Sequence, residues 1–72
     1  MKDEKFTIRA YGKSELAMLY FPYMSGHSAL ERFKVWLKVN PRLRHLLKIK
    51  GQTYTPKQVR QIVGEVGEPF EL

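Results

Sequence analysis

Hydrophobic residues in the middle of this chain recur every three or four positions, which is the spacing of one face of an α-helix. The clearest stripe consists of Ala29, Leu30, Phe33, Trp36 and Leu37. A long amphipathic helix is therefore predicted, ending before Asn40-Pro41. Either Ser25 or Ser28 is its predicted N-cap, since both are serines and Ser28 has Glu31 at the capping-box spacing.

A shorter helix is predicted before the long one, from the helical spacing of Leu16, Ala17, Leu19 and Tyr20. Ser14 is its predicted N-cap, and Glu15 suits the positive end of the helix dipole. Pro22 should end this helix near Tyr20 or Phe21, because the residue before a proline disfavours the helical conformation.

Two further helices are predicted towards the C-terminus. Asn40-Pro41 is a favourable start for the first, and Gly51 is its plausible end. The second begins at Thr55-Pro56-Lys57-Gln58, which combines an N-cap, a proline at the first helical position and a capping-box glutamine. Gly67 and Pro69 end it. The two core stripes are Leu43, Leu46 and Leu47, and then Val59, Ile62, Val63 and Val66.

The N-terminal segment has the period of a strand. Phe6, Ile8 and Ala10 alternate there with Thr7, Arg9 and Tyr11. This pattern predicts a short strand or extended arm that ends at Gly12 and Lys13. Thr53 and Tyr54 could pair with it.

The predicted fold class is mainly α. It is a compact bundle of three to four helices with a helix-turn-helix-like arrangement and a short N-terminal strand or arm. A chain of 72 residues makes one domain at most. We therefore expect residues 1–72 to form a single helical domain, with an ordered core at about residues 6–69.

Charge is distributed unevenly along this chain of net charge +6. Nine of the thirteen Lys and Arg residues lie between Arg32 and Gly64, and all seven Asp and Glu residues lie outside that stretch. Such segregation favours a polyanionic partner, because clustered like charges repel one another. The sequence thus predicts a non-enzymatic domain that binds nucleic acid, with DNA as the favoured partner. The predicted nucleic-acid-binding residues are Ser28, Arg32, Lys34, Lys38, Arg42, Arg44, Lys48, Lys57 and Arg60.

A DNA-reading helix is one interpretation of this region. In a helix-turn-helix, the N-terminal residues of the second helix approach base edges, and here these would be His27, Ser28 and Glu31. The connection between the two helices is longer than the usual three or four residues. The same cations would also suit a simple solvated surface, so both interpretations stay open.

The uncharged run from Leu16 to Met24 supports an alternative function. A short helix cannot bury all of these apolar side chains, and Tyr and Met are frequent at interfaces. The alternative prediction is a protein–protein interaction adaptor or homodimer that uses Tyr20, Phe21, Tyr23 and Met24. The competing interpretation places the whole run in the core.

No catalytic residue is predicted. His27 and His45 have no cysteine and no acid pair near them, and there is no glycine-rich phosphate loop. No metal, cofactor or small-molecule substrate is expected. The apolar run from Leu16 to Met24 has nine residues, whereas a membrane span needs about 20 apolar residues. The expected location is the cytoplasm, with no membrane partner.

The chain also resembles a known family. Residues Tyr11 to Pro22, which read YGKSELAMLYFP, resemble the opening of a family of small uncharacterised proteins from gut bacteria, a domain of unknown function numbered 4248. Further segments similar to that family are Trp36-Leu37-Lys38 followed by Asn40-Pro41, then Tyr54 to Val59, then Gly67-Glu68-Pro69. The resemblance covers about Phe6 to Pro69. It implies a basic helical middle and a last helix capped by Thr-Pro, and it implies no activity, cofactor or binding residue.

Overall fold

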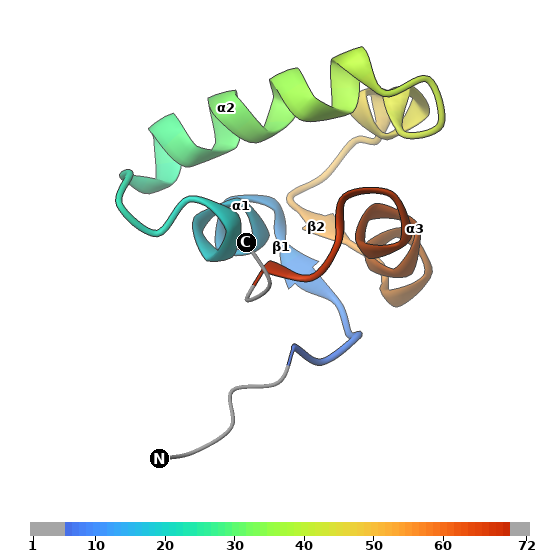
Figure 1. Ribbon diagram of the computed structural model, residues 1–72, viewed down its shortest axis with the longest axis horizontal. Coiled ribbons are helices and arrows are strands. Elements are labelled where there is room, and N and C mark those ends of the chain that lie inside the picture. The colour runs from blue at the N-terminus through green and yellow to red at the C-terminus, as the bar shows by residue number, and fades with distance from the viewer. Residues whose placement is uncertain (1–5, 70–72) are drawn as a thin grey trace.

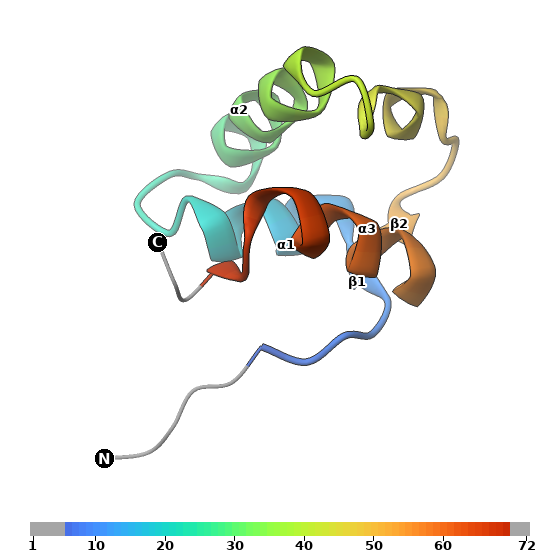
Figure 2. The ribbon, with the colours of Figure 1, turned by 45° about the vertical axis from the view of Figure 1, so that its right-hand side comes forward.

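The computed structural model describes residues 6–69, so residues 1–5 and 70–72 of the predicted domain lie outside it. Its helices are α1 (Lys13–Tyr20), α2 (Gly26–Val39), the 3₁₀ helix η1 (Arg44–Lys48) and α3 (Pro56–Val66). Strands β1 (Tyr11–Gly12) and β2 (Thr53–Tyr54) pair with each other. Helix α2 lies across α1 and α3 (Figure 1, Figure 2). The prediction of a mainly α fold with three to four helices is confirmed. None of the helices within residues 6–69 has the length and hydrophobicity needed to span a bilayer.

The buried hydrophobic side chains form one core. They are Phe6, Tyr11, Leu16, Ala17, Tyr20, Ala29, Phe33, Leu37, Leu43, Leu46, Tyr54, Val59 and Ile62. Phe33 of α2 is fully buried. Its ring centroid lies 5.5 Å from that of Tyr20 in α1 and 6.2 Å from that of Tyr54 in β2. A single α2 side chain therefore contacts both the first helix and the sheet.

Helix α2 begins after Ser25, whose Oγ accepts a hydrogen bond from the Ser28 backbone N–H at 3.3 Å. Of the two predicted N-caps, Ser25 is therefore the one that is used, and Ser28 lies inside the first turn. The helix ends at Val39, before Asn40-Pro41, as predicted. The predicted stripe faces the core, although Trp36 is only half-buried.

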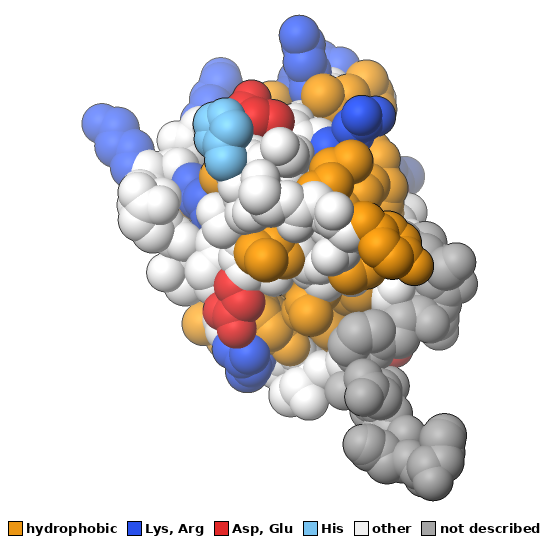
Figure 3. Space-filling view, turned by 90° about the vertical axis from the view of Figure 1, so that its left-hand side faces the viewer, with side chains coloured by type: hydrophobic (Ala, Val, Ile, Leu, Met, Phe, Trp, Pro, Cys, Tyr) orange, Lys and Arg blue, Asp and Glu red, His pale blue; other side chains and the backbone are white. Residues whose placement is uncertain are grey.

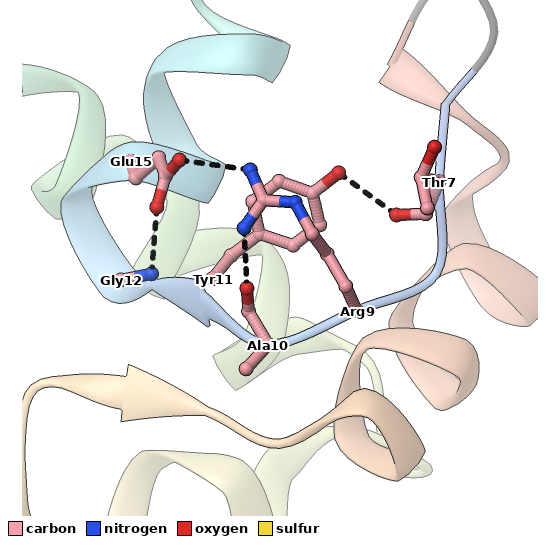
Figure 4. Close-up of polar contacts among 6 residues, drawn as sticks. All are labelled: Thr7, Arg9, Ala10, Tyr11, Gly12 and Glu15. Carbon is pink, nitrogen blue, oxygen red and sulfur yellow. Dashed lines mark hydrogen bonds and ion pairs between the residues drawn. The ribbon is translucent and has the colours of Figure 1, made fainter.

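Helix α1 begins earlier than predicted, directly after the strand. Its N-cap is Gly12, and the assignment of Ser14 as the N-cap is wrong. The Glu15 carboxylate accepts the Gly12 N–H at 3.1 Å and also binds the Arg9 guanidinium at 3.1 Å (Figure 4). Gly12 is already extended by its pairing with Thr53, so the helix starts as soon as the strand ends. The predicted end at Tyr20 is confirmed.

This cap makes a pH dependence of stability testable. The Gly12 N–H, and after it the Arg9 guanidinium, lowers the pKa of the Glu15 carboxyl below its ordinary value of 4.5. A lowered pKa in the folded state gives stability that is present above the unfolded pKa and is lost as pH falls through the folded pKa. We expect Glu15→Gln to melt at a lower temperature than the wild type at neutral pH. This difference should shrink as pH falls below about 4.5.

Thermal melts by circular dichroism across this pH range measure the effect. Glu31→Gln is the matched control, because the one ion pair of the Glu31 carboxylate among residues 6–69 is an exposed pair with Lys34 at 3.6 Å. A Glu15→Gln difference that stays constant from neutral to acidic pH would contradict the assignment of the cap.

The sheet is antiparallel and pairs Tyr11 with Tyr54 and Gly12 with Thr53. The predicted pairing of Thr53 and Tyr54 with the N-terminal segment is confirmed. Of the predicted short strand or extended arm, only Tyr11–Gly12 is a strand, and Gly12 extends it instead of ending it. The arm before it is held by side chains, since the Tyr11 hydroxyl donates to the Thr7 carbonyl at 2.8 Å (Figure 4).

The predicted third helix is only the five-residue 3₁₀ helix η1. Leu43 and Leu46 are buried, but Leu47 is 38% exposed, so its assignment to the core is wrong. With three residues per turn, positions three apart share a face, whereas a position four apart turns away. Gly51 has φ of 97° in the turn before β2, beyond the end of η1 at Lys48.

Helix α3 has the predicted capping box. The Thr55 Oγ1 accepts from the Gln58 N–H at 3.2 Å, and the Gln58 Oε1 accepts from the Thr55 N–H at 2.8 Å. Pro56 is the first helical residue. The helix ends at Val66, and Gly67 follows with φ of 88°. Both predicted boundaries of this helix are confirmed.

Candidate nucleic-acid interface

All nine residues predicted to bind nucleic acid are exposed. They are Ser28, Arg32, Lys34, Lys38, Arg42, Arg44, Lys48, Lys57 and Arg60. They lie on α2, on the turn that follows it, on η1 and on α3. The packing of these elements determines which of the cations act together.

Four of the cations lie on the last turn of α2, on the turn after it, at the start of η1, and on the part of α3 that lines a hollow with that turn. The Arg44 Nε donates to the Lys38 carbonyl at 3.2 Å, which holds the start of η1 against the last turn of α2. Arg42, two residues before Arg44, lines one surface hollow together with Arg60 of α3. We call Lys38, Arg42, Arg44 and Arg60 the junction cluster.

One carboxylate lies beside the junction cluster. The Glu65 Oε2 is 3.8 Å from the Arg42 guanidinium, and the Asn40 side-chain amide donates to the Glu65 Oε1 at 3.4 Å. The Arg42 side chain is nevertheless 80% exposed, so water screens this pair strongly. Lys38, Arg44 and Arg60 form no ion pair within residues 6–69. The cluster therefore keeps most of its positive charge.

The N-terminal end of α2 is a separate surface. Ser28 lines a shallow hollow there together with His27 and Glu31, and Glu31 pairs with Lys34. Ten residues of helix, about 15 Å at 1.5 Å per residue, separate Ser28 from Lys38. The structure thus does not bring the predicted base-reading residue and the junction cluster together.

The predicted protein-interaction residues are divided between core and surface. Tyr20 is 5% exposed and donates its hydroxyl to the Gly67 carbonyl at 2.6 Å, so its assignment to an interface is wrong. Tyr20 belongs to the same helical pattern as Leu16 and Ala17, which are also buried. Phe21 and Met24 are half-buried, and Tyr23 is 98% exposed. Figure 3 views the side of the molecule where the turn between α1 and α2 lies. Hydrophobic side chains gather on this side, and Lys and Arg side chains lie along its upper edge, where α2 runs.

Comparison with known protein families identifies the family of this chain. Residues 7–69 match the family described as Domain of unknown function (DUF4248). The chain belongs to this family. The match extends from the N-terminal arm to the end of α3, so the DUF4248 domain includes the whole junction cluster. Comparisons with curated proteins and with solved structures give no match.

Sequence reasoning missed one feature of this DUF4248 domain. Trp36 was assigned to the core stripe, but it is half-buried and lines an open hollow at the end of α2. The other apolar residues that line this hollow are Val39, Pro41 and Val66. Val39 is 69% exposed, although it is hydrophobic. A valine outside the core stripe of α2 is the signal in the sequence that could have indicated this surface.

Proposed function

We propose that this DUF4248 domain is a cytoplasmic, non-enzymatic module that binds nucleic acid through the phosphate backbone. The observation that carries the proposal is the junction cluster, in which Arg44 binds the backbone of Lys38 and Arg42 lines the same hollow as Arg60. Bringing like charges together costs free energy unless a polyanion offsets it. Phosphates at regular spacing along a strand provide such a polyanion.

The position of the cluster determines the kind of contact that we propose. The α1–turn–α2 unit is helix-turn-helix-like, but the junction cluster is at the C-terminal end of α2, away from the end that reads bases in such motifs. Contacts to phosphate carry no sequence information. The proposed binding is therefore largely independent of sequence.

A salt series tests this proposal. If all four cations of the junction cluster neutralise phosphates on a duplex, the logarithm of affinity should fall with the logarithm of salt concentration at a slope of about −3.6. Duplexes of unrelated sequence should bind with similar affinity. Fluorescence anisotropy of labelled duplex and single-stranded oligonucleotides, starting at ~50 mM salt, measures both expectations, since phosphate contacts are strongest at low salt. No binding of either oligonucleotide at that salt would refute the proposal.

A further inference from the structure

The hollow beside Trp36 has the form of a small binding site. It is open, has a volume of about 670 Å³ and lies between the end of α2, the turn after it and the end of α3. This volume lies in the range of clefts that hold drug-sized ligands, so it exceeds what one planar group needs. Its apolar wall comes from Trp36, Val39, Pro41 and Val66. The surface therefore offers an aromatic ring and aliphatic side chains to a ligand.

Three aromatic rings lie next to the Trp36 ring. Its ring centroid is 4.7 Å from that of Phe21 and 5.5 Å from that of Tyr20. Phe33 lies 6.1 Å away on the core side. An aromatic side chain held in this way loses little conformational entropy when a flat ligand packs on it.

The polar rim joins this hollow to the junction cluster. Arg42 and Glu65 both line the Trp36 hollow and the neighbouring hollow that contains Arg60, so one cation and one carboxylate connect the two hollows. A ligand with an aromatic group beside a phosphate would match both surfaces at once. The hydrogen bonds of Asn40 to Glu65 and of the Arg42 N–H to the Asn40 Oδ1 place polar atoms at the rim.

From this juxtaposition we infer that the junction cluster holds single-stranded nucleic acid, with one unpaired base seated against Trp36. The inference rests on the proposed nucleic-acid binding and specifies its substrate. In a duplex the bases are stacked inside and cannot enter the hollow, whereas an unpaired base can stack on an aromatic side chain. The basic cluster next to the hollow favours this occupant over an uncharged peptide.

Trp36 is itself the probe, because it is the single tryptophan of the chain. We expect a single-stranded oligonucleotide to quench the Trp36 emission and to bind more tightly than a duplex of the same length. Loss of a base–aromatic contact corresponds to about 5- to 150-fold in affinity. The titration uses the full chain at ~50 mM salt, with anisotropy of the labelled strand recorded in parallel.

Two valines of α2 supply a matched pair of variants. Val39→Gln places a polar group in the wall of the hollow, whereas Val35→Gln makes the same change at another exposed position of the helix. We expect Val39→Gln to weaken single-strand binding at least about fivefold and to reduce the quenching. Val35→Gln should leave both unchanged, and neither variant should alter duplex binding.

The outcomes separate the inference from the proposed function. If the single strand binds by anisotropy and the Trp36 emission does not change, nucleic-acid binding stands and the inference about the hollow fails. If neither strand binds, both fail. Quenching by a peptide of alternating Glu and Leu, with none by the oligonucleotide, would assign the hollow to a protein partner and overturn the inference.

Discussion

Replacement of Phe33 by alanine is expected to unfold the domain. The Phe33 side chain is fully buried and packs against aromatic rings from α1, α2 and β2. Truncation of a buried phenylalanine costs about 3–5 kcal/mol, because the lost transfer free energy adds to the cost of the cavity. At about 0.05–0.15 kcal/mol per residue, the free energy of unfolding of this chain is only about 4–11 kcal/mol.

Far-ultraviolet circular dichroism during heating measures the effect. The variant should have no cooperative transition, or a melting temperature far below that of the wild type. Val35→Ala is the control on the same helix, because Val35 is 51% exposed and its truncation should change the free energy of unfolding only by about 0.5 kcal/mol. A Phe33→Ala variant that melts like the wild type would mean that the described core is wrong.

Neutralisation of two cations of the junction cluster should weaken nucleic-acid binding strongly. Lys38 and Arg60 are suitable positions because both are exposed and neither forms an ion pair within residues 6–69. In the double variant Lys38→Gln/Arg60→Gln, the slope of log affinity against log salt should become less steep by about 2. Affinity at ~50 mM salt should fall on the order of a hundredfold, because two fewer sets of counterions are released.

The control variant removes the same number of positive charges at positions outside the junction cluster. Arg32→Gln/Lys50→Gln also removes two exposed cations, both of them outside the junction cluster. It should lose much less affinity and retain a steeper slope than the cluster variant. Equal losses in the two variants would show that binding depends on the net charge of +6 and not on the cluster. Circular dichroism spectra of both variants should match the wild type, since the changed side chains lie on the surface.

The parts of the fold that the sequence predicted well are those stabilised within a few residues. The capping box of α3 is an example, because Thr55, Pro56 and Gln58 contain every group that it needs. The start of α1 was predicted wrongly because it depends on Gly12 pairing with Thr53, which lies 41 residues away in the sequence. Local cap preferences cannot reveal such a distant partner.

In the candidate site too, the features set by nearby residues were predicted and those set by distant contacts were not. The helical spacing correctly placed the cations on the outside, since exposure follows from periodicity. Their grouping could not be predicted, because it depends on how η1 folds against α2 through the Arg44–Lys38 hydrogen bond. The exposure of Leu47 was missed for a related reason, since the pattern alone does not distinguish a 3₁₀ helix from an α-helix.

The shortness of the sheet has a consequence for how this domain behaves at high concentration. An edge strand can template the addition of another chain when it presents a long row of backbone donors and acceptors. Strands β1 and β2 have two residues each, so their edges offer very few such groups. The N-terminal arm is therefore anchored to the core without creating a surface that promotes fibril growth.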